Sequence, residues 1–255
     1  MNHRARKRFG QHFLTAPEVI EQIVSTIDPR DGEIIVEIGP GQAAITEPLS
    51  YVASELHAVE FDRDLAATLR TRFAARENVT IHEADALNFD FSSIGNQLRI
   101  VGNLPYNIST PLLFRLLDFK DIIQDMHFML QKEVVDRIAA VPGTKAFGRL
   151  TVMLGCRMES VPLFDVGPDA FSPPPKVMSS VVRMRPLVED RYGLKNPDVL
   201  EQLVKQAFSR RRKTLRNALQ GMADVADIEA AGLDVTARPE QVPIDGWVTL
   251  ANRVA

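Results

Sequence analysis

The stretch that decides the fold of this 255-residue chain is Leu98-Arg99-Ile100-Val101-Gly102-Asn103-Leu104-Pro105-Tyr106. Its apolar beginning predicts a buried strand, and Ser109-Thr110-Pro111 just beyond it predicts the start of a helix. The amide of Asn103, the carbonyls beside Pro105 and the ring of Tyr106 then lie at the carboxyl end of a strand. Ligands bind at such strand ends in open α/β sheets. These groups suit a flat ring that carries an amine.

Strands alternate with helices on both sides of this stretch. Further strands are expected at 34–38, 56–61, 79–81 and 126–130, and helices near 43 and at 64–75. The alternation indicates an α/β fold, a Rossmann-like parallel sheet with helices on both faces. Residues 158–166 and 177–185 predict two more strands, whereas 148–156 fit a helix or a strand equally.

The two ends of the chain carry their own signals. Thr15-Ala16-Pro17-Glu18 predicts a capping box that opens a helix. Near the other end, a polar link at 186–197 is followed by Asn196-Pro197-Asp198, a start signal for an amphipathic helix. We therefore expect a first domain over 1–188, with 1–14 as a flexible basic segment, and a small all-helical domain over 189–255.

Composition narrows the class of protein. Hydrophobic content of 45% and charged content of 25% are ordinary for a globular protein. No apolar run is long enough to cross a bilayer, and no apolar signal core follows the basic N-terminus. We therefore expect a cytoplasmic protein with no membrane partner. The single cysteine, Cys156, excludes an internal disulfide and a multi-cysteine metal site, so no metal is expected. No feature demands more than a monomer.

Basic residues gather in two places although the net charge is −3. The candidates for nucleic-acid contact are Arg6, Lys7 and Arg8 at one end and Arg210, Arg211, Arg212, Lys213 and Arg216 near the other. Two concentrated patches on a mildly acidic body suit a polyanion held at defined places. A flexible basic tail together with a solvated helix face accounts for the charges equally well.

A nucleoside site is predicted at three successive strand ends. Gly39 and Gly41 form a turn that a ligand can approach closely. Glu60, about twenty residues further on, can accept from ribose hydroxyls, a spacing that also fits a relaxed dinucleotide pattern and therefore NAD. Asp85 follows the third strand and can accept from an adenine amine. The ordered set of turn and two acids favours S-adenosylmethionine.

With a methyl donor, the Asn103–Tyr106 stretch acquires a mechanism. Adenine N6 is a poor nucleophile because its lone pair is delocalised. Acceptance of N6–H by Asn103 Oδ1 and a carbonyl near Pro105 would free that lone pair, while Tyr106 would stack on the base for roughly 1–3 kcal/mol. A purely structural loop, in which Asn103 caps the helix and Tyr106 packs, is the alternative.

The segment Phe171-Ser172-Pro173-Pro174-Pro175-Lys176 is the expected partner loop. Its prolines would hold Phe171 as the opposite aromatic face of the base, and Lys176 can reach a phosphate. The alternative is a proline-stiffened connection with Phe171 in the core.

Taken together, these motifs resemble the rRNA adenine N6-dimethyltransferases. The resemblance is carried by residues 7–14, 37–41, Glu60, Asp85, 103–109, 129–134, 171–177 and 207–217. It implies a class I methyltransferase fold with S-adenosylmethionine as donor. It also implies dimethylation of two adjacent adenosines in a hairpin loop near the 3′ end of 16S rRNA, in a small-subunit precursor during ribosome biogenesis.

The resemblance also implies roles for single residues. It assigns His12, Leu14, Gly39, Glu60, Asp85 and Asn103 to the cofactor, and Asn103 to the target amine as well. The family usually has asparagine at the position of His12; a backbone contact would survive that change, but an amide-specific contact would not. Residues 207–217 resemble the ribosomal branch more than the antibiotic-resistance branch, which modifies 23S rRNA. An RNA-binding assembly factor with a vestigial site is the remaining alternative.

Overall fold

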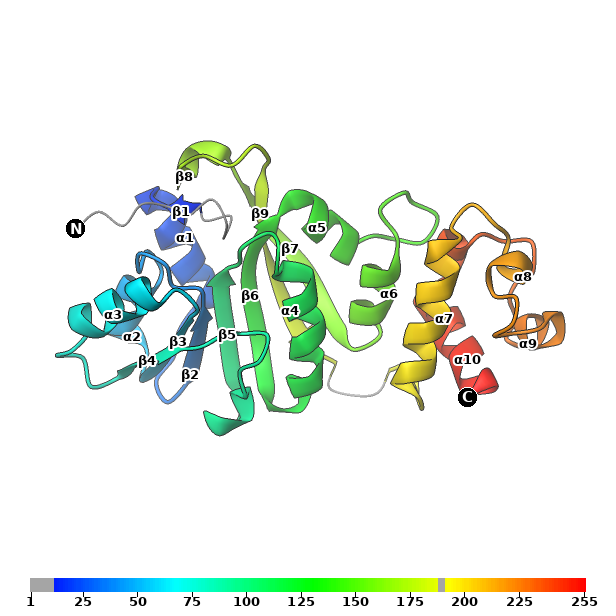
Figure 1. Ribbon diagram of the computed structural model, residues 1–255, viewed down its shortest axis with the longest axis horizontal. Coiled ribbons are helices and arrows are strands. Elements are labelled where there is room, and N and C mark those ends of the chain that lie inside the picture. Colours follow the sequence, from blue (N-terminus) through cyan, green and yellow to red (C-terminus); the bar gives the residue numbers. More distant parts are fainter. Residues whose placement is uncertain (1–11, 188–190) are drawn as a thin grey trace. The chain divides into compact units, whose positions relative to one another are not determined.

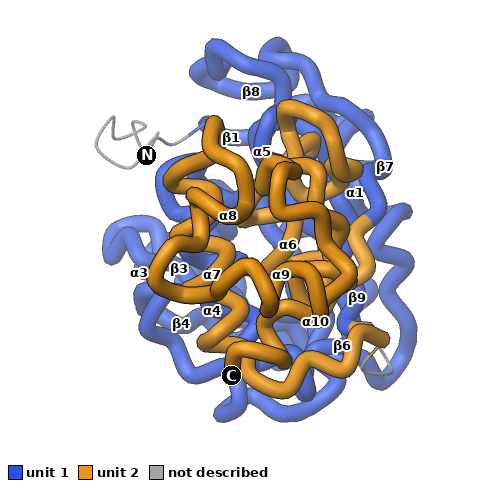
Figure 2. The backbone as a smooth tube through the Cα atoms, turned by 90° about the vertical axis from the view of Figure 1, so that its right-hand side faces the viewer, with its two compact units in different colours: residues 1–135, 161–186 blue, residues 136–160, 187–255 orange. Residues whose placement is uncertain are grey.

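The computed structural model describes residues 12–187 and 191–255. The chain divides into two compact units (Figure 2): unit 1 comprises residues 1–135 and 161–186, and unit 2 comprises 136–160 and 187–255. The predicted boundary at residue 188 therefore misassigns 136–160, which belong with the C-terminal helices. Among the described residues, none of the helices has the length and apolarity needed to cross a membrane.

Unit 1 is built on a seven-stranded sheet in the order β4-β3-β2-β5-β6-β9-β7 (Figure 1). Its strands are β2 (Ile34–Ile38), β3 (Glu55–Glu60), β4 (Val79–Glu83), β5 (Leu98–Asn103), β6 (Ile123–Gln131), β7 (Met158–Val166) and β9 (Ser179–Pro186). Strands β4, β3, β2, β5 and β6 run parallel, as predicted, whereas β9 runs antiparallel to β6. The sheet is thus mixed, because the short connection from β7 to β9 contains no crossover helix of the kind that parallel strands need.

Helices pack against this sheet through apolar faces. They are α1 (Pro17–Ile27), α2 (Thr46–Val52), α3 (Arg63–Arg72) and α4 (Ser109–Leu116). Helix α5 (Lys132–Ile138) begins in unit 1 and ends in unit 2. One core cluster joins Ile23 and Ile27 of α1 and Leu49 of α2 to Ile35 and Leu56 of the sheet. Burial of this kind stabilises the fold by about 25 cal/mol per Å² of apolar surface removed from water.

The predicted capping box at Thr15 and the predicted helix start near Ala43 are wrong, each for a local reason. Helix α1 has Ala16 as its N-cap without a side-chain cap, because the Thr15 hydroxyl donates instead to the carbonyl of Ala170 at 3.2 Å. The helix expected near Ala43 begins at Thr46, since Ala43 has a left-handed φ of 69° that interrupts helical geometry.

Unit 2 is helical. Its helices are α6 (Arg149–Gly155), α7 (Pro197–Ser209), α8 (Leu215–Ala218), α9 (Val225–Ala230) and α10 (Ile244–Val254). The predicted start of α7 is confirmed, because Asn196 Oδ1 accepts from the amides of Asp198 and Val199, both at 3.2 Å.

Helix α6 explains why residues 136–160 join unit 2. A Cβ on Gly155 would lie 2.6 Å from Ile244 Cδ1, so α6 packs directly against a side chain of α10. Arg149 of α6 also pairs with Glu201 of α7 at 2.6 Å. Because Leu150 to Leu154 are all buried, α6 shows no polar face, which is why its periodicity could not separate helix from strand.

Candidate active site

The order of the strands changes direction between β2 and β5: β3 and β4 extend the sheet on one side of β2, and β5 and β6 extend it on the other. Strand β2 pairs with β3 on one side and β5 on the other, so the loops after β2 and β5 open a crevice at their carboxyl ends. A Cβ on Gly102 would lie 2.5 Å from the Ile38 carbonyl oxygen. Glycine therefore allows the end of β5 to close on β2, which brings the Gly39 turn and Asn103 together.

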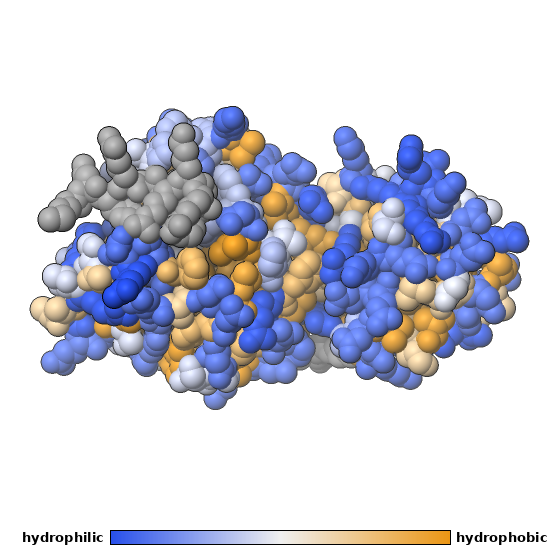
Figure 3. Space-filling model, viewed as in Figure 1, coloured by the Kyte–Doolittle hydropathy of each residue, from blue (hydrophilic) through white to orange (hydrophobic). Residues whose placement is uncertain are grey.

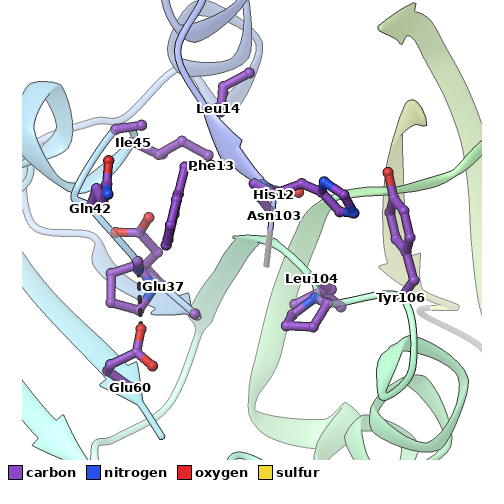
Figure 4. A pocket seen from close by; sticks show the side chains of 15 residues that line it. His12, Phe13, Leu14, Glu37, Gln42, Ile45, Glu60, Asn103, Leu104 and Tyr106 are labelled. Carbon is purple, nitrogen blue, oxygen red and sulfur yellow. Dashed lines mark hydrogen bonds between the residues drawn. The ribbon is translucent and has the colours of Figure 1, made fainter. Parts of the chain in front are cut away.

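A pocket, here called the switch pocket, occupies this crevice (Figure 4). Its lining residues are His12, Phe13, Leu14, Glu37, Gly39, Pro40, Gly41, Gln42, Ala44, Ile45, Glu60, Asn103, Leu104, Pro105 and Tyr106. An adjoining pocket contains Asp85, Phe61 and Ile108, and shares Gly39, Glu60 and Pro105 with the first. The predicted turn, both predicted acids and the Asn103–Tyr106 stretch therefore border one continuous pair of pockets.

Glu60 ties the glycine turn to the end of β3. Its Oε2 accepts from the amide of Gly41 at 3.1 Å, and its Oε1 accepts from the amide of Asp62 at 2.8 Å. Burial raises the pKa of Glu60, while these backbone amides oppose that rise. Since each carboxylate oxygen has two lone pairs, both can still accept from a diol.

Asp85 lines the adjoining pocket, where hydrogen bonds hold its carboxylate. One of its oxygens accepts from the amide of Leu87 at 3.0 Å, and the other accepts from Asn88 Nδ2 at 2.9 Å. The loop after β4 is thereby fixed. Asp85 has acceptor capacity left for one exocyclic amine.

Glu37 is a site residue that sequence reasoning did not assign. It is 2% exposed, lines the switch pocket, and its Oε2 has no hydrogen-bond partner among the described residues. Burial raises the pKa of Glu37 to about 7. A buried carboxyl of this kind calls for a donor or cation from a ligand. The available signal was an acid in the strand directly before the glycine turn.

The Asn103–Tyr106 stretch is held from several sides. Asn103 Nδ2 donates to the His12 carbonyl at 3.2 Å, which leaves Oδ1 as its acceptor. The Tyr106 hydroxyl lies 3.0 Å from Ser179 Oγ on β9. Asn103 does not cap the next helix, because the N-cap of α4 is Ile108. The helix cap of the structural alternative is therefore absent, and a binding role for the stretch stays a prediction.

The end of the N-terminal segment is a strand. β1 (Phe13–Leu14) pairs antiparallel with β8 (Phe171–Ser172), so flexibility was the wrong prediction for these two residues. His12 and Leu14 line the switch pocket, and the His12 backbone contact is of the kind that survives replacement of asparagine. The predicted RNA contacts Arg6, Lys7 and Arg8 lie outside the described residues.

Phe171 does not present the open face predicted for it. It is 4% exposed and packs in a core cluster with Leu14, Met129 and Val181. The pairing of β8 with β1 sets Phe171 opposite Leu14. The ring of Phe171 therefore lies in the same apolar cluster as Leu14. The prediction of an exposed aromatic face is wrong, and the core alternative describes this residue.

The basic residues of unit 2 form a second feature, here called the basic groove. It is lined by Ser209, Arg210, Arg211, Arg212, Lys213, Asn217 and Gln220. Arg216 is exposed but outside this lining, and Lys176 is exposed on the loop after β8 in unit 1. The visible face of unit 2 is largely hydrophilic (Figure 3). An RNA role for these residues stays a prediction.

The sheet order, the single antiparallel strand β9 and the glycine turn beside two strand-end acids define a class I methyltransferase. The fold is similar to a dimethyladenosine transferase from Plasmodium falciparum, with a TM-score of 0.82, 24% identity, and coverage of 94% of this chain and 96% of that one. It is also similar to the 23S rRNA methyltransferase ErmE, with a TM-score of 0.73, 25% identity, and coverage of 95% and 99%.

A family model described as ribosomal RNA adenine dimethylase matches residues 2–255, and the chain belongs to that family. Among curated relatives, "Ribosomal RNA small subunit methyltransferase A" of Pseudomonas aeruginosa is 51% identical, over 99% of this chain and 96% of the relative. The protein of the same name from Aromatoleum aromaticum is 53% identical, over 99% and 95%.

Proposed function

We propose that this chain transfers methyl groups from S-adenosylmethionine to N6 of two adjacent adenosines in the hairpin loop near the 3′ end of 16S rRNA. Each adenosine is dimethylated within a precursor of the small ribosomal subunit, by a monomer acting in the cytoplasm. The observation that carries the proposal is the shared pocket wall: Asn103 and Tyr106 border the same crevice as Glu37, Gly39 and Glu60.

The residues of the two pockets would hold the cofactor group by group. When bound, S-adenosylmethionine supplies an electrophilic sulfonium methyl group. Glu60 would accept from its ribose hydroxyls and Asp85 from its adenine amine, at the ends of neighbouring strands β3 and β4. The buried carboxyl of Glu37, whose Oε2 has no partner among the described residues, would face its α-ammonium group.

The Asn103–Tyr106 stretch would prepare the target amine. Asn103 Oδ1 would accept one N6–H. The Pro105 carbonyl already accepts from the Ile108 amide at 3.1 Å, so the Leu104 carbonyl is the better candidate for the second. With both hydrogens engaged, the nitrogen lone pair turns toward the methyl group. Alignment then provides most of the acceleration, and no strong base is needed, because the proton becomes acidic only as charge develops on nitrogen.

RNA would be held by phosphate contacts and read at an extruded base. Lys176 and the basic groove supply cations that position a backbone without reading its sequence. A base inside a helix cannot reach the switch pocket, so the target adenosine must leave its stack. Small-subunit RNA is favoured over 23S rRNA because relatives named for the small subunit are 51% and 53% identical, against 25% for ErmE.

The test is methyl transfer to small-subunit particles that lack this modification. Labelled S-adenosylmethionine should label the 16S rRNA, and mass spectrometry of the 3′ hairpin should find two dimethyladenosines. Tight particle binding without label would support the assembly-factor alternative. Label in 23S rRNA instead would support the resistance-type alternative.

A further inference from the structure

Tyr51, the penultimate residue of α2, presents an open aromatic face at the surface of unit 1. It is 63% exposed. The guanidinium carbon of Arg76 lies 3.8 Å from the centroid of the Tyr51 ring, so a cation covers one face of that ring. The large exposure must then come from the opposite face and the edge. One side of the ring is therefore stacked, and the other side is in contact with water.

The backbone around Tyr51 is fixed by a residue from the loop after α3. Asn78 Nδ2 donates to the Ser50 carbonyl at 3.1 Å and to the Ala53 carbonyl at 2.9 Å. These two carbonyls flank the end of α2, and Arg76 precedes Asn78 by two residues. The Asn78 amide therefore ties the two segments together and places Arg76 beside the ring of Tyr51.

The hydroxyl of Tyr51 is fixed as well. It donates to Glu47 Oε1 at 3.1 Å, while Glu47 Oε2 pairs with Arg72 at 2.8 Å. The nearby carboxylate is thus engaged by these two residues and does not pair with Arg76. Among the described residues, the Arg76 guanidinium has no hydrogen bond and no ion pair. Its positive charge and its donors are therefore available to a ligand.

A second arginine–aromatic stack of unit 1 lacks this availability. The guanidinium carbon of Arg115 lies 4.5 Å from the centroid of Phe119, and the same guanidinium donates to Asp118 Oδ2 at 2.9 Å. A carboxylate beside the stack already engages its donors. Arg76 has no such carboxylate partner, and a guanidinium with unengaged donors can hold a phosphate through two parallel hydrogen bonds.

We infer that Tyr51 and Arg76 form a contact site for an unpaired nucleotide of the small-subunit RNA other than the target adenosine; this rests on the proposed function. The base would stack on the open face of Tyr51, and its phosphate would pair with Arg76. Neither side chain alone points to RNA, but a nucleotide supplies both a flat ring and an anion. Aromatic faces beside cations hold single-stranded nucleic acid without reading its sequence.

The site adjoins the surface where the target RNA would lie. A groove between α1 and α2 is lined by Tyr51 and Arg72, and it shares Leu14, Gln42 and Ala44 with the switch pocket. The nucleotide site and the switch pocket therefore occupy neighbouring parts of unit 1, within reach of one RNA. The contact adds affinity for the particle and supplies no group to methyl transfer.

Four substitutions separate the ring face from the cation. Tyr51→Ala removes the face, whereas Tyr51→Phe keeps the face and removes only the bond to Glu47. Arg76→Ala removes the charge, whereas Arg76→Lys keeps the charge without the planar fork. Arg115→Ala is the matched control, because it removes the same charge from a stack whose arginine is already paired.

The experiment measures the Kd of undermethylated small-subunit particles at several salt concentrations. Tyr51→Ala should raise the Kd about tenfold, within the range for one base–aromatic stack, and Tyr51→Phe should stay within about twofold of wild type. Arg76→Ala should raise the Kd about fivefold and make the slope of log affinity against log salt shallower by about 0.7, the value for one single-strand phosphate. Arg76→Lys should keep that slope. Arg115→Ala should change the Kd less than about twofold.

Photo-crosslinking identifies the class of partner. With p-benzoylphenylalanine in place of Tyr51, the bound particle should yield crosslinks to 16S rRNA. Crosslinks to a ribosomal protein alone would overturn the inference and make this a protein-docking surface. Equal losses in Tyr51→Phe and Tyr51→Ala would also overturn it, because the bond to Glu47 would then matter and the face would not. So would an unchanged Kd in both alanine variants.

Failure of the proposed function gives a different result. If the wild-type protein binds the particle but does not methylate 16S rRNA, the proposed reaction is wrong, and the ranking of Kd values still decides the nucleotide site. If the protein methylates the particle and the Kd ranking fails, the inference alone is wrong. A wild-type protein that does not bind the particle would overturn both.

Discussion

The switch pocket and the basic groove use charge in opposite ways. In the pocket, Glu37 and Glu60 are 2% and 6% exposed, and backbone amides fix the carboxylate of Glu60. In the groove, Arg210, Arg212 and Lys213 are exposed to water. Buried groups act strongly and only in one geometry, whereas exposed charges are screened and largely interchangeable. Loss of one pocket atom should therefore stop chemistry, and loss of one groove charge should only weaken binding.

The largest effect is expected from Asn103→Ala. This change removes the acceptor for N6–H and the donor to the His12 carbonyl, but no phosphate contact. Methyl transfer should fall by at least about 10²-fold, as when one preorganised hydrogen-bonding group is lost. Single-turnover rates and particle binding should be measured together. An equal loss of particle affinity would show that Asn103 supports the structure rather than the reaction.

Gly102→Ala should shift the backbone at the switch pocket and lower the stability of the protein. The new Cβ would lie 2.5 Å from the Ile38 carbonyl oxygen, so β5 and β2 must separate. Overpacking of this kind costs about 1–3 kcal/mol, and each kcal/mol lowers Tm by about 2–4 °C in a chain of this size. Thermal unfolding measures this fall in Tm. Gly148→Ala is the control, because its Cβ would meet nothing closer than 3.8 Å; an equal fall in Tm there would refute the steric explanation.

A triple substitution to glutamine at Arg210, Arg212 and Lys213 should weaken particle binding by about tenfold at physiological salt. The slope of log affinity against log salt should become shallower by about two, because three phosphate contacts are lost. The rate at saturating particle should change little. Arg211→Gln is a useful comparison, since Arg211 already donates to the Thr144 carbonyl at 3.2 Å and lies 3.6 Å from Glu240. An unchanged salt slope in the triple variant would remove the groove from the RNA interface.

Much of the switch pocket could be predicted from the sequence, because the ends of its strands could be located there. Periodicity located the strands that end at Glu60 and Asn103 and those that end just before Gly39 and Asp85, and parallel strands end at one edge of a sheet. Side-chain direction was not predictable in the same way. Phe171 was expected either to face the base or to lie in the core. The pairing of two short strands decided for the core, and that pairing joins segments far apart in the chain.

Glu37 and α6 show two other limits. Glu37 lies within a buried strand, where an acid breaks the apolar pattern. That break was visible, but its meaning depends on the surroundings of the carboxyl, whose Oε2 has no partner among the described residues. Helix α6 was ambiguous because it is buried on all sides, and its membership in unit 2 rests on contacts with α7 and α10. Local sequence patterns show neither the surroundings of the Glu37 carboxyl nor the contacts of α6.

The smallest effect expected is a pH dependence of cofactor binding that arises from Glu37. Burial raises the pKa of Glu37 to about 7, so the free protein holds this carboxyl largely protonated below that pH. A ligand α-ammonium favours the carboxylate and lowers its pKa, so binding must release a proton below pH 7. Affinity for S-adenosylhomocysteine should therefore rise about fivefold from pH 6 to 8 and level off above about pH 8. Calorimetry in two buffers of different ionisation enthalpy measures both the affinity and the proton release. Glu37→Gln should bind more weakly and lose this dependence, because its amide does not titrate. The same pH slope in Glu37→Gln would assign the titration to another group. The buried carboxyl of the pocket would then not respond to the charge of the ligand.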